Sequence, residues 1–453
     1  MRKNIDLTKG NIWKAILVFA VPIFFSNIFQ QFYNTMDTLI VGNYLGDASL
    51  AAIGAAGAIY ELLIGFSMGV GNGFSLVVAR SFGAKDEEQL KQAVAGSLVI
   101  GTGMTLGIMI LSWFNLYPLL KLLGTPFDII EQTYSYIILI SLFVGVMFAY
   151  NLLSSFLRAI GNSLMPLIFL VISSMINVGL DLVFLIKLHM GVQGTAVATI
   201  IAQGISAILC LIYIIKKAPI LIPKKRHFKI GKELYIELAG QGFSMGFMMA
   251  IVCTGTIILQ KAINGFGYLI IAGHTTARKI NSFCMMPCST LSLSISTFVS
   301  QNKGAGQLDR IKKGVRAGII LSIAWGIAAV ILLYMFSENL VSLVSGSEEA
   351  KVLKNASWYL QVNSAFYGIL GILLILRNAL QGIGKKLIPL VSSIIELIGK
   401  IVFVIICIPH MGYFGVILCE PIIWCLMCAQ LLYAFYGDSY IRGKEETKIL
   451  VNE

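Results

Sequence analysis

The chain has 453 residues, of which 57% are hydrophobic and 12% are charged, with a formal net charge of +12. A soluble protein carries about 25% charged residues, so this chain lacks the charge to cover a soluble surface. A disordered or collagen-like chain is excluded as well, because apolar residues predominate without a Gly-x-y repeat. The class that remains is a polytopic membrane protein.

Apolar runs long enough to cross a bilayer recur along the whole chain. About 20 apolar residues span the hydrocarbon core as a helix, and charges, Pro and Gly mark where such helices begin and end. These signals predict an all-α membrane protein with twelve transmembrane helices, at residues 12–40, 50–80, 92–116, 130–157, 166–188, 191–215, 234–263, 268–300, 315–337, 352–380, 387–409 and 411–436.

The first span carries an unusual number of polar side chains. Gln30, Tyr33, Asn34 and Asp37 follow one another at intervals that place them on one face of a helix. A face of this kind cannot point at lipid, and ionisable groups inside a membrane are usually functional. We therefore expect this face to line a polar site.

The second span contains Gly65, Gly69 and Gly73 at four-residue intervals. The glycines could be mistaken for a phosphate-binding loop, but no strand precedes them and no Gly-Lys-Ser/Thr follows. Small residues at this spacing let two helices approach closely. We expect a helix-packing surface.

Further polar residues lie in the fourth to sixth spans. They are Tyr136, Asn151 and Ser154 in the fourth, Asn177 and Asp181 in the fifth, and Thr199 in the sixth. Two carboxylates with amide and hydroxyl oxygens can hold Na⁺, or they can hold a proton, because burial and a neighbouring like charge both favour the protonated form. The alternative is that these groups only form hydrogen bonds between helices.

The chain is predicted to be a tandem repeat joined by a basic linker. A shift of 221 residues aligns His189-Met190-Gly191-x-x-Gly194 with His410-Met411-Gly412-x-x-Gly415, and a shift of 223 aligns Gly161 and Pro166 with Gly384 and Pro389. Six spans per half is an even number, so the halves enter the membrane from the same side as parallel repeats. We expect an N-lobe at 1–215, a cytoplasmic linker at 216–233, a C-lobe at 234–436 and a cytoplasmic tail at 437–453. Two such six-helix bundles suit alternating access to a cavity between the lobes.

The C-terminal half departs from the N-terminal half in its polar residues. Lys400 stands where the repeat would place Asn177, and Glu396 precedes Lys400 by one helical turn. We expect these two charges to form an internal ion pair. Four other charged residues could line a cavity, form ion pairs or extend to the membrane surface. They are Glu61, Arg278, Lys279 and Glu420.

The basic residues are distributed unevenly across the predicted membrane. One side carries most of them, including Arg2, Lys3, the linker and the C-terminal tail. The other side carries Lys121, Lys187, Lys351 and Lys354. The positive-inside rule then places both termini in the cytoplasm. The positive charge flanks helices and forms no aromatic-interleaved patch, so a nucleic-acid partner is not expected.

The sequence resembles the multidrug and toxic compound extrusion (MATE) family over nearly its whole length. The resemblance is carried by twelve spans in two halves and by three stretches of sequence. They are Gln30-Gln31-Phe32-Tyr33-Asn34-Thr35-Met36-Asp37, Arg158-Ala159-Ile160-Gly161-Asn162 and Gly191-x-x-Gly194-x-Ala196-x-Ala198-Thr199. It implies an H⁺- or Na⁺-driven antiporter that exports cationic, amphipathic compounds from a prokaryotic cell, through the inner or plasma membrane.

The resemblance also implies roles for individual residues. Asp37 looks like the family's first-helix acid, and Asn177, Asp181 and Thr199 fall at the spacing of its other N-lobe cation-site residues, so Na⁺ is a candidate ligand of these four. Gln30, Tyr33, Tyr136, Asn151 and Ser154 match neighbouring cavity positions, to which we add Asn34 from the same helical face. Pro22 resembles a first-helix proline associated with bending. Some members carry a second cation site on helices 7 and 10. Here Gln260 lies in span 7 and span 10 has no acid, which favours the N-lobe site.

Two other function classes make different predictions for the sequence. A flippase for a lipid-linked saccharide should line its cavity with several Arg or Lys that meet pyrophosphate. A membrane-embedded enzyme should show a nucleophile or metal motif, and the sequence has neither His-Glu-x-x-His nor Gly-x-Ser-x-Gly. We expect a monomeric transporter that is not an enzyme, has no cofactor besides its coupling ion, and binds small organic cations.

Overall fold

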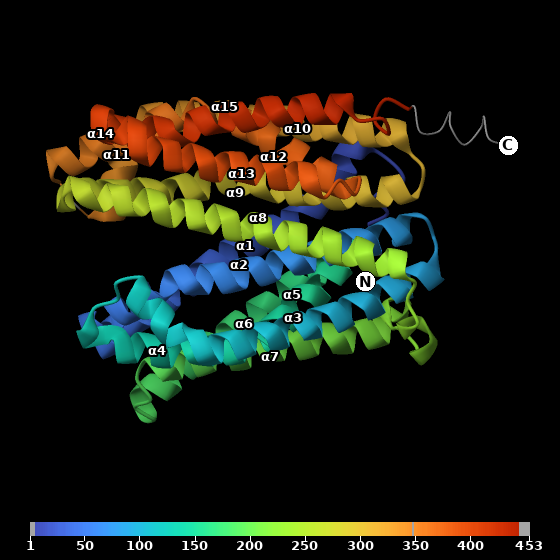
Figure 1. Ribbon diagram of the computed structural model, residues 1–453, viewed down its shortest axis with the longest axis horizontal. Coiled ribbons are helices and arrows are strands. Elements are labelled where there is room, and N and C mark those ends of the chain that lie inside the picture. The colour runs from blue at the N-terminus through green and yellow to red at the C-terminus, as the bar shows by residue number, and fades with distance from the viewer. Residues whose placement is uncertain (1–4, 347, 444–453) are drawn as a thin grey trace. The chain divides into compact units, whose positions relative to one another are not determined.

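The computed structural model describes residues 5–346 and 348–443, which form helices joined by short connections (Figure 1). No β-strand occurs within these residues, so the predicted all-α fold is confirmed. Arg2, Lys3 and the last ten residues of the predicted tail, 444–453, lie outside the described residues.

The transmembrane helices correspond to the predicted spans. Within the described residues, 10 helices are long and apolar enough to cross a membrane, and there are up to 12 spans if each of two bent helix pairs counts as one. The bent pairs are α4 (Phe127–Leu142) with α5 (Val144–Ala159), at 49°, and α11 (Ala350–Ser364) with α12 (Tyr367–Gly382), at 54°. Spans 130–157 and 352–380, predicted as single helices, are therefore broken near their middle.

Contacts divide the described chain into two compact units. The first comprises residues 5–6 and Val21–Ala250, and the second comprises Leu7–Ala20 and the described residues from 251 onward. The helices of the first unit are α1 (Ile12–Leu45) from Val21 onward, α2 (Asp47–Gly83), α3 (Glu87–Leu122), α4, α5, α6 (Leu164–Leu182) with the π-helical turn η1 (Val183–Lys187), α7 (Val192–Lys217), the short 3₁₀ turns η2 (Pro219–Leu221) and η3 (Lys225–Phe228), and α8 (Lys232–Ile263) as far as Ala250.

The second unit repeats this order of helices. It contains the start of α1, the remainder of α8, η4 (Asn264–Phe266), α9 (Tyr268–Gly304), α10 (Leu308–Ser345), α11, α12, α13 (Leu387–Val402) with the π-helical turn η5 (Phe403–Cys407), α14 (Ile408–Met411) and α15 (Tyr413–Gly437). The predicted lobe boundary at the linker stays a prediction, because α1 and α8 each contribute to both units.

Equivalent helices pack in the same pairs within each unit. In the first unit α2 contacts α5 and α6 contacts α7, and in the second α9 contacts α12 and α13 contacts α15. Glycines with positive φ precede equivalent helices: Gly46 and Gly267 before α2 and α9, and Gly191 and Gly412 before α7 and α15. The repeat seen in the sequence is therefore also a repeat of backbone geometry.

The predicted glycine packing surface lies between α2 and the first half of α8, inside the first unit. A Cβ at Gly69 would lie 2.6 Å from the Met245 carbonyl oxygen, and one at Gly73 would lie 2.5 Å from the Gln241 carbonyl oxygen. Both neighbours are helix backbone and cannot move aside alone. The glycines thus allow two helix backbones to touch, as the four-residue spacing predicted.

A large side chain at this surface should destabilise the protein. We expect Gly73→Leu to lower the stability by about 1–3 kcal/mol or more, because the two backbones must separate. The matched control is Gly103→Leu in α3, since a Cβ at Gly103 meets nothing within 4 Å. Thermal unfolding of the purified proteins in detergent measures both, and equal midpoints for the two variants would contradict the packing role.

Candidate functional site

The polar face of α1 borders a cavity within the first unit. The cavity has a volume of about 330 Å³ and is lined by residues of α1, α2, α4 and α7. The lining residues are Tyr33, Asn34, Asp37, Thr38, Val41, Ile53, Gly54, Gly57, Tyr60, Glu61, Tyr136, Thr195 and Thr199. Five residues expected at a site from the sequence are among them: Tyr33, Asn34, Asp37, Tyr136 and Thr199.

Tyr33 connects α1 to α7 at the wall of this cavity. Its side chain is buried, and its hydroxyl donates a hydrogen bond of 3.1 Å to Oγ1 of Thr199. The two residues are far apart in sequence, so this bond fixes the position of the α1 polar face relative to α7.

Asn177 and Asp181 form the buried part of the site, and the half-buried Asp37 lies beside them. Asn177 and Asp181 lie one turn apart on α6 and are both 0% exposed, and Asp37 lies close enough to Asp181 for the two carboxyl groups to interact electrostatically. Within the described chain, Oδ1 of Asp37, both side-chain oxygens of Asp181 and both side-chain polar atoms of Asn177 have no hydrogen-bond partner. Buried polar atoms are normally satisfied, so this group has unused capacity to bind a ligand.

The donor set fits a small hard cation or a proton. Two carboxylates, an amide oxygen and the hydroxyl of Thr199 are oxygen ligands, which hard cations prefer. Within the described residues, no group of three or more His, Cys, Asp or Glu side chains is placed to hold a metal ion.

Three predicted cavity residues are not among those that line the cavity. Asn151 donates to the Met147 carbonyl oxygen and Ser154 donates to the Asn151 carbonyl oxygen, both within α5. Gln30 lies two turns before Asp37 on α1 and is half-buried. Their assignment to substrate binding stays a prediction.

Pro22 lies inside α1, as expected from the sequence. Proline has no N–H, so one hydrogen bond of the helix is missing at this point. The hydroxyl of Ser26 donates to the Pro22 carbonyl oxygen at 2.9 Å, which competes with the backbone hydrogen bond that the same oxygen would accept. Both features weaken the backbone hydrogen bonding of α1 at this turn.

Sequence reasoning assigned no role to the other lining residues. Tyr60 and Thr195 are the ones among them that matter most for binding, because both carry a hydroxyl group, and the role of the acid Glu61 was left open. Tyr60 and Glu61 stand together in an apolar span, which is a signal that could have been used. Thr195 lies one turn before Thr199 on α7 and shares its helical face.

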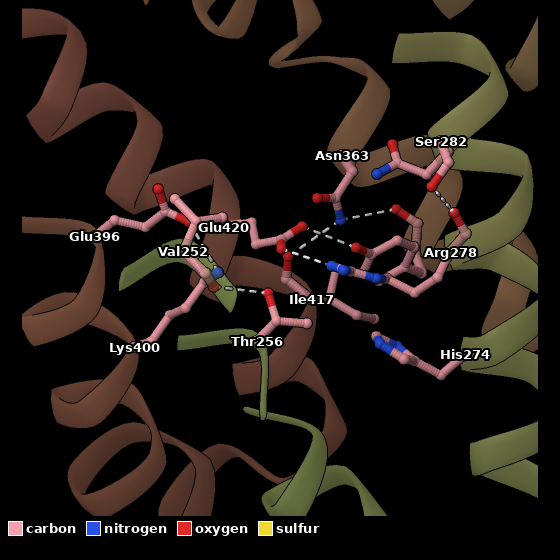
Figure 2. A network of polar contacts seen from close by, with 12 residues as sticks. Val252, Thr256, His274, Arg278, Ser282, Asn363, Glu396, Lys400, Ile417 and Glu420 are labelled. Atoms are coloured by element: carbon pink, nitrogen blue, oxygen red, sulfur yellow. Dashed lines mark hydrogen bonds and ion pairs between the residues drawn. The ribbon is translucent and has the colours of Figure 1, made fainter. Parts of the chain in front are cut away.

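The second unit contains a network of charged side chains, shown in Figure 2. The predicted ion pair is confirmed, with Lys400 Nζ 2.9 Å from Glu396 Oε1. Arg278, left open by the sequence, contacts Glu420 at 2.7 Å. These acids are therefore paired with basic side chains, whereas Asp37 and Asp181 interact with each other.

A sequence comparison establishes the family. The pattern of the MatE family matches residues 22–183 and again residues 245–406. The chain belongs to the MatE family. The predicted membership of the multidrug and toxic compound extrusion family is confirmed, and one family pattern that matches twice confirms the duplication. This MatE protein is therefore a membrane transporter by family.

Curated relatives and solved structures agree with this assignment. The chain is 28% identical over 410 residues to probable multidrug resistance protein YoeA of Bacillus subtilis strain 168, covering 89% of this chain and 88% of the relative. It is 23% identical over 402 residues to probable multidrug resistance protein NorM of Thermotoga maritima, covering 85% and 83%. The fold is similar to the crystal structure of MATE in the bent conformation, with a TM-score of 0.89, 20% identity and 99% of each chain covered.

We expect loss of the Tyr33 hydroxyl to weaken transport without unfolding the protein. Tyr33→Phe removes one hydrogen bond, worth about 1 kcal/mol, and frees α1 from Thr199. Efflux should fall about five-fold at matched protein level. Tyr433→Phe in α15, whose residue is 86% exposed, is the control. Unchanged efflux in Tyr33→Phe would show that the contact has no role in transport.

Proposed function

We propose that this MatE transporter exports amphipathic organic cations by antiport with H⁺ or Na⁺, and that Asp37, Asn177, Asp181 and Thr199 bind the coupling ion. The observation that carries the proposal is the group of buried polar atoms without hydrogen-bond partners on Asp37, Asn177 and Asp181, beside the cavity. The relatives are named for multidrug resistance or multidrug export, which supports a broad range of small-molecule substrates.

The lining of the cavity suits a cationic, amphipathic substrate. Tyr33, Tyr60 and Tyr136 provide aromatic faces, and Asp37 and Glu61 provide negative charge. Aromatic rings attract the positive charge of an organic cation, and they also pack against its apolar part. Asn34, Asn151, Gln30 and Ser154 are the further residues that we assign to this role.

Coupling follows from the repulsion between two buried carboxylates. When Asp37 and Asp181 are both ionised, their mutual repulsion and their burial are costly. A bound proton or Na⁺ relieves this repulsion, so α1 and α6 can pack more closely. The movement is transmitted to the Tyr33–Thr199 contact and to the turn at Pro22. Substrate and cation then weaken each other's binding by the same factor, as linkage requires.

Transport by purified protein in liposomes tests the proposal. Efflux of a fluorescent organic cation is measured with a pH gradient alone, with a Na⁺ gradient alone and with neither. We expect efflux above the gradient-free rate with one of the two gradients, which identifies the coupling ion. Equal rates in all three conditions would reject antiport.

A flippase is the alternative, and the charge of the cavity argues against it. A lipid-linked pyrophosphate needs basic side chains, and none of the described residues that line the cavity is basic. A flippase would translocate a fluorescent lipid-linked saccharide in the same liposomes and would not transport the organic cation.

We further propose a monomer in the prokaryotic plasma membrane with both termini in the cytoplasm. Protease protection of tags at the two ends, in right-side-out and inverted vesicles, tests the orientation.

A further inference from the structure

The charged network of the second unit occupies the place in the repeat that the cavity occupies in the first. The comparison uses backbone landmarks that the two units share. Gly46 and Gly267 precede α2 and α9, which both have 37 residues. Gly191 and Gly412 precede α7 and α15 with φ values of 60° and 61°. Phe143 and Phe366 lie at the two helix breaks with φ values of −108° and −100°.

Counting from these landmarks pairs the residues of the two sites. Arg278 corresponds to Gly57, Tyr359 to Tyr136, and Glu420 to Thr199. Counted from the starts of α6 and α13, Lys400 corresponds to Asn177. Gly57, Tyr136 and Thr199 line the cavity of the first unit, and Asn177 belongs to its buried polar group.

In the second unit these positions are joined by ion pairs and hydrogen bonds. Arg278 Nη1 lies 2.7 Å from Glu420 Oε1, and the Tyr359 hydroxyl donates to Glu420 Oε2 at 3.0 Å. Figure 2 shows Arg278 and Glu420 pointing toward each other, with Glu396 and Lys400 beside them. Lys400 is 2% exposed and contacts Glu396 at 2.9 Å.

We infer that the second unit retains a monovalent-cation site whose cation is supplied by the protein itself. The guanidinium of Arg278 interacts with Glu420 and Tyr359, and the ammonium of Lys400 forms an ion pair with Glu396. A cation on a side chain cannot exchange with the solution. The equivalence to a cation site in the first unit rests on the proposed function, whereas the pairing of Arg278 with Glu420 can be tested in the second unit alone.

The partial exposure of Arg278 makes the site accessible to a test. The Arg278 side chain is 33% exposed, whereas that of Glu420 is 10% exposed. Removing the Arg278 side chain therefore opens a path to a buried carboxylate that lacks its cation. A small free guanidinium compound fits the space and the charge that the side chain leaves, whereas Na⁺ cannot donate hydrogen bonds to Glu420.

The experiment is thermal unfolding of purified protein in detergent, with methylguanidinium chloride or the same concentration of sodium chloride. We expect Arg278→Ala to unfold about 5 °C or more below the wild type, because a buried acid loses its partner. Methylguanidinium should restore at least half of this shift, and sodium chloride should not. The control is Lys279→Ala, the adjacent exposed residue, which should unfold like the wild type with either salt.

The double variant Arg278→Ala/Glu420→Gln separates loss of the ion pair from loss of packing. It should unfold at a higher temperature than Arg278→Ala and should not respond to methylguanidinium. If Arg278→Ala does not accumulate, recovery of accumulation in the double variant supports the inference. Failure of both variants to accumulate, full stability of Arg278→Ala, or an equal response of the double variant to methylguanidinium overturns it. None of these readouts involves transport, so they are independent of the coupling proposal.

Discussion

Replacing Asp37 or Asp181 by Asn should reduce gradient-driven efflux by about 5- to 150-fold, the range of a coupling free energy of 1–3 kcal/mol. Asn keeps the size of the side chain and mimics the protonated acid, but it cannot release a proton and offers Na⁺ no charge. Each variant therefore locks the site in the state that the coupling ion would produce. Dye efflux from vesicles at matched protein level measures the effect.

The same substitutions should not lower the unfolding temperature, although they reduce efflux. Both side-chain oxygens of Asp181 are buried without a hydrogen-bond partner within the described chain, and a buried charge of this kind is costly. Asp181→Asn should unfold at the same temperature as the wild type or above it. A lower unfolding temperature would show that the carboxylate is structural.

Asp128→Asn, at an exposed position in the first turn of α4, is the control for both measurements. It removes the same charge outside the cavity and should leave efflux unchanged. Wild-type efflux in both Asp37→Asn and Asp181→Asn would move the search for the coupling site to Glu61, because Glu396 and Glu420 are held in ion pairs.

The largest expected effect on stability concerns Glu396. Its carboxylate contacts Lys400 at 2.9 Å and Arg377 Nη2 at 3.8 Å, so Glu396→Gln leaves two buried cations without their acid. We expect a loss of about 3–5 kcal/mol. Lys400→Met should be milder, because Arg377 still faces Glu396. The double variant Glu396→Gln/Lys400→Met should be more stable than Glu396→Gln, since Arg377 keeps its hydrogen bond of 3.0 Å to Ser392.

A double-mutant cycle in detergent measures this coupling, and Glu87 with Lys91 provides a matched pair. These two residues form an ion pair at the same spacing, with the Glu87 side chain 61% exposed. Their cycle should show little coupling, because water screens exposed charges. Equal losses for the single and double variants at Glu396 and Lys400 would reject the buried pair.

Local patterns were enough to predict most of the fold. Apolar length and flanking charges placed every span on a helix, with ends that differ by up to eight residues at α10, and duplicated Gly and Pro positions revealed the repeat. The helix breaks at Phe143 and Phe366 were missed, because the predicted spans run through both positions without a Pro or a charge that would mark a stop. Gly145 and Gly368 follow the two breaks by two residues, but glycine is frequent in these helices and does not by itself mark a break.

The candidate site was predicted where one helix carries the pattern and missed where distant helices meet. Spacing along α1 was sufficient to single out Tyr33 and Asp37. The contact between Arg278 and Glu420 joins residues 142 positions apart, and no spacing rule links them. Asn151 satisfies its amide within its own helix, which composition cannot distinguish from an amide that faces a cavity.

The sharing of α1 and α8 between the two units constrains the order in which the protein can assemble. The first unit needs residues up to Ala250, so it cannot be completed until the opening helix of the second repeat has been synthesised. The second unit includes Leu7–Ala20. Arg310 in α10 donates hydrogen bonds to the carbonyl oxygens of Leu7, Lys9 and Gly10, so this segment gains these contacts only after α10 has been synthesised. Neither repeat can therefore mature as an independent domain during translation. A break in the linker would separate each unit from a segment of its own helical packing.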